Sequence, residues 1–402
     1  MIEITDKSKC CGCTACANAC PKECITMCAD EEGFLYPVIS TEKCISCGKC
    51  KRVCPCLQQT PLMQEWKTRA FVVRIKDEAV LTESTSGGGF SAIARQICDE
   101  GGVVIGAAFD EEFHIVHKVT SNYRDISKFR GSKYAQSELG ETFSDIKRLL
   151  QQGEVVLFSG TPCQVAGVKK YLGKNYKNLY TIDIVCRSIP SPKLWNEFIK
   201  TVVPQGVKQV RFRNKTYGYH SGTFIVEFKN GKIISSSNRV NKYMKAFHMN
   251  ICSRPSCYDC KFKSVERVSD FTLFDCWHPE KLINGFRDDD KGYTGCLVHS
   301  NKGLELLENI KTWTWVYNVD VKKALSFTGG MAEHSVIRPI VRSEFYTTLT
   351  EIGAVATLDR YVSVNLKDKF IECTKMFLYK TKLLKQVKKV KSLLLSIRGG
   401  IR

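Results

Sequence analysis

Short apolar runs alternate with amphipathic stretches along the middle of the chain. Apolar and β-branched runs predict strands at 70–75, 103–109, 154–159 and 179–186. Apolar residues at helical spacing predict helices at 90–98, 141–151 and 161–172, and the alternating stretch 113–119 predicts an edge strand. Because strand, helix and strand follow one another, we expect a parallel sheet with crossover helices, an α/β domain over residues 68–190.

Beyond residue 190 the pattern becomes less regular and predicts an α+β region over residues 191–362. A helix is expected at 193–202, and Asn230-Gly231 between apolar runs at 224–228 and 233–236 predicts a β-hairpin. Residues 303–361 are mostly helical in pattern, with a short strand at 313–317. The fold class expected for the whole chain is an α+β multidomain protein.

The first 57 residues are patterned by cysteine. Two runs have the same spacing, with two, two and three residues between cysteines, and each ends in Cys-Pro. This is the spacing of bacterial dicluster ferredoxins, in which the fourth thiolate of each run reaches the other [4Fe-4S] cluster. The expected ligand sets are Cys10, Cys13, Cys16 and Cys54 for one cluster and Cys44, Cys47, Cys50 and Cys20 for the other. Structural zinc or disulfides are the alternatives, but zinc usually takes two separated Cys-x2-Cys pairs. A linker is expected at 58–67.

A third group of cysteines lies far along the chain, at Cys252, Cys257 and Cys260. This spacing matches a third [4Fe-4S] site with a fourth ligand from elsewhere, and zinc is the alternative. Cys163 is the first candidate for the fourth ligand, because it falls in the first turn of a predicted helix, where the dipole stabilises a thiolate. Cys186, at the end of a predicted strand, is the second. The other cysteines are assigned to packing: Cys11, Cys24, Cys28, Cys56, Cys98, Cys276, Cys296 and Cys373.

The stretch 84–91, Ser-Thr-Ser-Gly-Gly-Gly-Phe-Ser, opens a predicted helix. Three glycines let backbone amides approach a ligand closely, and a helix N-terminus favours phosphate. A flexible loop is the alternative, because the dinucleotide spacing Gly-x-Gly-x-x-Gly is missing. Asp270 and Asp275 lie on a predicted strand, where they either orient a ligand or are ordinary strand-end carboxylates.

The composition is that of a soluble globular protein: the 402 residues are 43% hydrophobic and 25% charged. No long uncharged apolar run or signal peptide is recognised, so a cytoplasmic address is expected. The net charge of +19 is unevenly placed, since 366–402 hold eleven Lys and Arg against Asp368 and Glu372, which is nearly half of the excess. The tail at 363–402 therefore predicts a basic amphipathic helix. It either packs on the body or makes a peripheral contact with an anionic membrane or an acidic partner; nucleic acid is not expected, because no reader motif is present.

Several separate motifs lie between residues 1 and 340. They are the doubled cysteine run, Ser86–Ser91, Gly131–Tyr134 with Gln136-Ser137, Gly160–Gly167, Asp183–Cys186 with Pro190–Pro192, and Arg254–Cys260. Together they resemble the coenzyme F420 hydrogenase/dehydrogenase beta-subunit family, in its long bacterial form with an N-terminal dicluster ferredoxin unit.

The resemblance implies a flavoprotein in which FAD binds the α/β core beside a [4Fe-4S] cluster held by cysteines of that core. By position, the implied FAD contacts are Ser86, Gly87, Gly88, Gly89, Ser91, Ser132, Lys133, Tyr134, Thr161 and Gln164, with Lys133 as a phosphate or isoalloxazine partner. Single electrons pass through the clusters and a hydride leaves the flavin, or the reverse. The expected function is an FAD- and [4Fe-4S]-dependent oxidoreductase with an organic substrate and a redox partner protein, such as a ferredoxin or a dehydrogenase.

The substrate is not named by any motif. Archaeal members of the family reduce a deazaflavin, a plant member reduces a chlorophyll side chain, and bacterial members often lie in surface-polysaccharide loci. This chain departs from its relatives at Arg187-Ser188, where they commonly continue His-Gly, and at Phe274–His278, where they commonly end Gly-Asp-Phe-Trp-Gly. Both changes fall where substrate chemistry is expected. The alternative function is a non-catalytic electron-transfer subunit that hands electrons to a partner enzyme.

Overall fold

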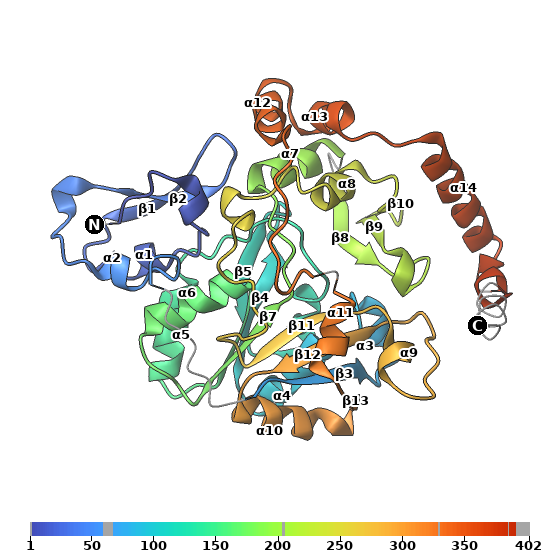
Figure 1. The fold of residues 1–402 in the computed structure, drawn as a ribbon, viewed down its shortest axis with the longest axis horizontal. Coiled ribbons are helices and arrows are strands. Elements are labelled where there is room, and N and C mark those ends of the chain that lie inside the picture. Colours follow the sequence, from blue (N-terminus) through green and yellow to red (C-terminus); the bar gives the residue numbers. More distant parts are fainter. Residues whose placement is uncertain (1, 59–66, 203–205, 329, 385, 391–402) are drawn as a thin grey trace.

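A computed structural model describes residues 2–58, 67–202, 206–328, 330–384 and 386–390 (Figure 1). Most of the predicted linker at 58–67 and the end of the predicted tail beyond residue 390 lie outside these ranges. Among the described residues, no helix is both long and apolar enough to cross a membrane.

The N-terminal unit repeats one backbone conformation, as its repeated sequence predicts. Gly12 and Thr14 of the first run, and Ser46 and Gly48 at the corresponding positions of the second, all have φ between +53° and +69°. A short helix follows each pair, and each helix carries the third cysteine of its run. The unit contains α1 (Ala15–Asn18), α2 (Lys49–Arg52), η1 (Lys7–Lys9), η2 (Thr41–Lys43) and an antiparallel hairpin of β1 (Ile25–Ala29) and β2 (Leu35–Ile39).

An eight-stranded mixed sheet forms the centre of the body (Figure 1), in the order β13-β3-β12-β11-β7-β6-β4-β5. Its strands are β3 (Arg69–Ile75), β4 (Val103–Phe109), β5 (Ile115–Thr120), β6 (Val156–Ser159), β7 (Leu179–Ile184), β11 (Phe271–Cys276), β12 (Tyr293–Val298) and β13 (Thr314–Val319). The four neighbours β4, β6, β7 and β11 are parallel, and the outer strands are antiparallel. The predicted parallel sheet is thus confirmed for β4, β6 and β7, and β5 is the predicted edge strand. The sheet does not end at residue 190, since three later strands join it.

Helices cover both faces of this sheet, because alternate strand residues point to opposite sides. Ile105 and Phe158 pack with α5 (Thr142–Gln151) and α6 (Pro162–Leu172), and the N-terminal unit joins this side. Val104 and Leu157 point to the other side and pack with α4 (Gly89–Asp99) and α10 (Asn301–Asn309). Short segments border the sheet: α3 (Glu78–Glu83), α9 (Pro279–Leu282), α11 (Val321–Ser326), η3 (Tyr123–Lys128) and η6 (Ile310–Thr312).

A second core is aromatic and centres on Trp195, which is fully buried against Phe212 and Tyr243. It lies between a three-stranded antiparallel sheet and four helices, and it contains the predicted helix and hairpin. Its elements are α7 (Pro192–Val202), β8 (Val207–Asn214), β9 (Thr223–Phe228), β10 (Ile233–Ser237), α8 (Lys242–His248), α12 (Arg342–Ile352) and α13 (Ala354–Tyr361), with η4 (Tyr219–Ser221) and η5 (Pro255–Cys257) in the loops.

The predicted amphipathic helix of the tail is present as α14 (Leu366–Lys380). Glu372 on its inner side accepts hydrogen bonds from the backbone N–H and the hydroxyl of Ser237. The side chains of Leu366, Phe370 and Phe377 are more than 60% exposed. The helix therefore lies on the body through polar contacts and leaves apolar side chains in solvent.

Arg254 fastens the N-terminal unit to the body, although it is only 1% exposed. Its guanidinium donates to the carbonyl oxygens of Cys10 at 2.8 Å and Leu35 at 2.9 Å, and to Oε1 of Gln136 at 2.8 Å. A second contact is the ion pair between Arg342 and Glu32, in which both guanidinium nitrogens reach the carboxylate. The unit is therefore held by directed bonds from two buried arginines.

We expect Arg254→Met to lower the free energy of unfolding by about 2 kcal/mol or more, because two carbonyls of the N-terminal unit and Gln136 lose their donor inside the protein. Arg148→Met removes an exposed ion pair with Asp145 and should cost less than about 0.5 kcal/mol. Anaerobic urea unfolding of both variants measures the difference. Equal unfolding midpoints for the two variants would contradict this role for Arg254.

Candidate cluster and cofactor site

The cysteines of the N-terminal unit line two cavities. The first N-terminal cavity is lined by Cys10, Cys13, Cys16 and Cys54, together with Cys11 and Cys56. The second N-terminal cavity is lined by Cys20, Cys44, Cys47 and Cys50, together with Cys24. The structure thus brings together the two crossed sets that the sequence predicts, in which the last cysteine of each run joins the other run.

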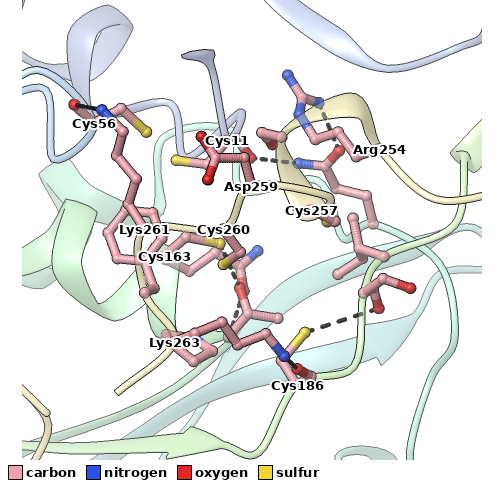
Figure 2. A pocket seen from close by; sticks show the side chains of 18 of the residues that line it. Cys11, Cys56, Cys163, Cys186, Arg254, Cys257, Asp259, Cys260, Lys261 and Lys263 are labelled. Carbon is pink, nitrogen blue, oxygen red and sulfur yellow. Dashed lines mark hydrogen bonds between the residues drawn. The ribbon is translucent and has the colours of Figure 1, made fainter. Parts of the chain in front are cut away.

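Four cysteines of the body line a third cavity, the core cysteine cavity, and Figure 2 shows their side chains. Cys163 lies in the first turn of α6, where Pro162 takes the first helical position. Cys186 follows β7, Cys257 ends η5, and Cys260 follows three residues later. Both candidates for the fourth position, Cys163 and Cys186, are therefore present in one cavity.

Cys252 does not line this cavity. It is fully buried in the aromatic core, and its carbonyl accepts a hydrogen bond from the Tyr346 hydroxyl at 2.7 Å. The next residue, Ser253, forms an antiparallel bridge with Pro190, which holds this segment against the core. Of the sequence-based set, the structure brings Cys163, Cys257 and Cys260 together with Cys186, and it places Cys252 outside the cavity.

The surroundings of the core cysteine cavity disfavour bare thiolates but are rich in cations. Burial raises the pKa of the Cys257 thiol to about 12 and that of Cys186 well above its ordinary value. The pKa of Cys163 is lowered, first by the hydrogen bond from the Cys11 thiol. The lining includes six cations against the single carboxylate of Asp259, namely Lys9, Arg187, Arg254, Lys261, Lys263 and Arg267. These cations suit a site whose occupant, with its thiolates, is negative overall.

Among the described residues, no three His, Cys, Asp or Glu side chains lie close enough together to hold a single metal ion. The cysteines line three cavities and do not converge on a single atom position. Each cavity brings four or more thiols together, a set of donors that suits either a [4Fe-4S] cluster or zinc.

A larger cavity of about 440 Å³ opens at the carboxyl ends of β4, β6 and β7. Ligands of open α/β sheets bind at this edge, and the volume is in the range of a small-molecule site. Nine of the ten residues to which the resemblance gives FAD contacts line it: Ser86, Gly88, Gly89, Ser91, Ser132, Lys133, Tyr134, Thr161 and Gln164.

Gly87, the tenth, packs on the sheet instead. A Cβ there would lie 2.5 Å from the backbone nitrogen of Thr294 and 2.5 Å from the carbonyl oxygen of Val73. The Thr294 hydroxyl accepts hydrogen bonds from the N–H groups of Gly87 at 2.9 Å and Gly89 at 3.3 Å. The glycine loop is thus tied to β12, and at Gly87 glycine is required by the close approach of the sheet. Gly87 is therefore the one of the three glycines that does not line the large cavity.

Lys133 lines the large cavity, but its ammonium group donates to the carbonyl oxygens of Phe129, Arg130 and Gly131. Burial lowers its pKa to about 7. Arg130, which the sequence did not single out, lies at the start of α4, where its Nε donates to the Ser91 hydroxyl at 3.1 Å and its Nη1 pairs with Glu83 at 2.6 Å. Arg130 therefore places a cation, paired with Glu83, beside the first turn of α4.

His117 and Arg187 also line the large cavity, and no motif pointed to the histidine. Nε2 of His117 is 3.1 Å from the carbonyl oxygen of Ser159, so Nε2 carries the hydrogen, and the buried Nδ1 has no hydrogen-bond partner among the residues that the structure describes. Burial lowers the pKa of His117 to about 4, which keeps the ring neutral. Arg187 donates to Oδ1 of Asn250 at 2.8 Å and to the carbonyl oxygen of His248 at 2.9 Å. An acceptor nitrogen and a guanidinium thus border the same space.

The two aspartates near β11 have different roles. Asp270 accepts hydrogen bonds from the backbone N–H and the hydroxyl of Thr181, both at 2.8 Å, and so ties β11 to β7. Asp275 lines the large cavity, pairs with Arg213 and accepts from the Tyr219 hydroxyl at 3.2 Å. The ligand-facing alternative therefore applies to Asp275 alone.

Neighbouring cavities share walls. The large cavity and the core cysteine cavity have six lining residues in common: Thr161, Gln164, Cys186, Arg187, Ser188 and Ile189. The core cysteine cavity and the first N-terminal cavity share Cys11 and Cys56, and the Cys11 thiol is hydrogen-bonded to both Cys163 and Cys56. The three cavities therefore form a continuous series from the N-terminal unit to the large cavity.

Comparison with known proteins links this geometry to one family. The family model for the C-terminal part of the coenzyme F420 hydrogenase/dehydrogenase beta subunit matches residues 153–322, which include the four body cysteines that line the core cysteine cavity. A "Coenzyme F420-dependent sulfite reductase" of Methanocaldococcus jannaschii is 22% identical over 348 residues, 80% of this chain and 49% of the relative. The chain thus spans about half the length of this curated relative.

A solved structure is also similar, a chain of the F420-reducing [NiFe] hydrogenase complex from Methanosarcina barkeri. It covers 68% of this chain and 89% of its own, with 19% identity and a TM-score of 0.45. On the sequence matches, residues 153–322 are similar to the C-terminal part of the coenzyme F420 hydrogenase/dehydrogenase beta subunit, and the chain resembles this family.

Proposed function

We propose that this protein is an FAD- and [4Fe-4S]-dependent oxidoreductase that relays electrons between its N-terminal unit and an organic substrate in the large cavity. The observation that carries the proposal is the series of three cavities with shared walls, which runs from the first N-terminal cavity through the core cysteine cavity to the large cavity. The first two of these, and the separate second N-terminal cavity, are each lined by four or more thiols. A redox enzyme needs its electron carriers at such short separations. The named activity of the curated relative, a sulfite reductase, is consistent with redox chemistry in this family.

The residues fit three clusters. Each N-terminal cavity has four thiols in the crossed pattern of dicluster ferredoxins. We assign the third cluster to Cys163, Cys186, Cys257 and Cys260. Lys261 and Lys263 extend along this cavity, with their ammonium groups bonded to the carbonyl oxygens of Cys56 and Cys186. Their positive charge would offset the negative charge of a thiolate-bound cluster. The positive charge of the iron would stabilise the thiolate form, which burial of the cysteines otherwise disfavours.

The large cavity fits a flavin dinucleotide. The N-terminus of α4 and Arg130 together form a positive end for a pyrophosphate. The opposite end borders Cys186 and Arg187, which also line the core cysteine cavity. Clusters transfer one electron at a time and a flavin stores two, so together they connect a one-electron partner to hydride chemistry.

Side chains that line the large cavity offer specific contacts to a bound cofactor or substrate. His117 presents a neutral acceptor nitrogen, which can take a hydrogen bond from a bound N–H or O–H group. Arg213 is held against Asp275 and lies over the Trp277 ring at 4.9 Å, forming a polar and aromatic wall. We assign the substrate to the organic class, and we place the reaction in surface-polysaccharide biosynthesis on the resemblance of the chain to bacterial family members. An electron-transfer subunit that hands electrons to a partner enzyme is the second candidate.

Anaerobic purification with iron, flavin and absorption measurements tests the cofactor set. We expect about twelve irons and about one FAD per chain, from three four-iron clusters and one flavin site. A flavin-free protein with about eight irons would contradict the proposal and favour the electron-transfer subunit.

The ligand assignment of the third cluster predicts opposite results for two buried cysteines. Cys186→Ser should lose about four irons, because it removes a ligand from the core cysteine cavity. Cys252→Ser should keep all of them, because Cys252 packs in the aromatic core. Iron counts of the two purified variants, with Cys296→Ser as a control for a buried cysteine of the main sheet, measure this. Iron loss from Cys252→Ser alone would restore the sequence-based set.

We also propose that α14 makes a peripheral contact with anionic membranes. Its exposed Leu366, Phe370 and Phe377 lie among lysines, a combination that favours the interface of negatively charged lipids. Replacing these three residues with Ser should abolish sedimentation with vesicles that contain anionic lipid, and it should leave the iron content unchanged. Unchanged sedimentation of the triple variant would contradict this contact.

A further inference from the structure

We infer that an acidic one-electron carrier protein docks over the second N-terminal cavity, and that the first N-terminal cavity links this docking face to the body. The inference rests on the proposed function, since it takes the two N-terminal cavities as cluster sites. It adds the place where electrons enter, the order of the sites and the charge of the partner.

The order of the cysteine cavities follows from the residues that line them. The first N-terminal cavity shares Cys11 and Cys56 with the core cysteine cavity, whereas the second N-terminal cavity has no lining residue in common with it. The first run also packs directly on α6, where a Cβ on Gly167 would lie 3.0 Å from the Cys13 sulfur. The second N-terminal cavity shares no lining residue with any of the other three, so the first N-terminal cavity is the one that adjoins the body.

The second N-terminal cavity is open to solvent. Cys47 is the one exposed thiol among the eight cysteines predicted to bind the N-terminal clusters, and Ile45 beside it is 58% exposed. At the first N-terminal cavity, Cys13, Cys16 and Cys54 are all buried. Because electron transfer between proteins requires a short separation, a partner reaches the cysteine cavities most directly at Cys47.

Five cations surround this opening and define a basic face: Lys22, Lys43, Lys49, Lys51 and Arg52. All five are exposed, and none has a carboxylate partner among the described residues. The Arg52 guanidinium donates to the carbonyl oxygen of Cys47 at 3.0 Å, which places one cation directly beside the exposed thiol. On the other side of the unit, by contrast, Lys7 is paired with Asp30 and Glu31.

An exposed apolar centre with a rim of unpaired cations is complementary to a protein with an acidic rim. Such complementarity accelerates encounter and weakens as salt screens the charges. The partner is therefore a small acidic electron carrier, of the ferredoxin or flavodoxin kind in its chemistry.

The test measures binding of the holoprotein to a purified acidic [2Fe-2S] ferredoxin by calorimetry. Lys49→Glu combined with Lys51→Glu should weaken binding at least tenfold at 50 mM salt. Binding of the wild type should fall by a similar factor between 50 and 500 mM salt. The matched control is Lys229→Glu with Lys232→Glu, in the exposed turn between β9 and β10, which lies on the opposite side of the molecule (Figure 1) and should bind like the wild type.

Two results would overturn the inference: a Lys49/Lys51 variant that binds like the control, or wild-type binding that does not weaken with salt. The second measurement uses no variant, so it decides the matter even if the charge reversals disturb the neighbouring cysteines. Failure of the proposed function is recognised separately, because it is read from the iron and flavin contents and not from the affinity. Equal affinity in a protein that holds its full iron and flavin would reject the docking face alone.

Discussion

The buried guanidinium of Arg254 positions the N-terminal unit, and with it every cysteine cavity, against the main sheet. It has no carboxylate partner among its described hydrogen bonds and donates instead to two carbonyls of the N-terminal unit and to Gln136. It also lies over the ring of Tyr36 at 4.3 Å, and it lines the core cysteine cavity. Burying an unpaired charge is costly unless other groups compensate it. In the proposed holoprotein, the thiolates of Cys10 and Cys257, which flank Arg254, provide that compensation.

This constraint explains why a small unit with little apolar core of its own can be held in one orientation. Its hairpin and short helices enclose mainly cysteines, so directed bonds from Arg254 and Arg342 replace the apolar burial that orients larger domains. The bonds bring Cys11 and Cys56 against Cys163. A series of redox sites requires fixed separations of this kind. The main sheet fixes the separation at the other end of the series, because Cys186 follows β7 and the large cavity opens at the same edge.

Much of this could be predicted from the sequence, because local patterns determine it. Cysteine spacing predicted the crossed sets of the N-terminal unit, and apolar periodicity predicted β4, α6, β7 and the tail helix. The exchange of Cys252 for Cys186 could not be predicted, since it depends on the bridge between Ser253 and Pro190, residues far apart in the chain. Nor could the role of Gly87, which is set by β12 some two hundred residues later, or the addition of β11, β12 and β13 to the first sheet. Contacts between residues that are far apart in the chain cannot be recognised from the local sequence pattern of either residue.

In the proposed mechanism, electrons travel from the N-terminal unit through the core cysteine cavity to the large cavity. Stopped-flow absorption of the anaerobic holoprotein, mixed with a reduced acidic carrier protein, follows this path in time. In the wild type, bleaching of the cluster absorption should be followed by bleaching of the flavin. In Cys257→Ser, the N-terminal clusters should still be reduced, while the flavin stays oxidised at least a hundred times longer. This delay corresponds to an increase of roughly 3 kcal/mol in the barrier to electron transfer when the intermediate cluster is lost. Flavin reduction at the wild-type rate in that variant would contradict this path.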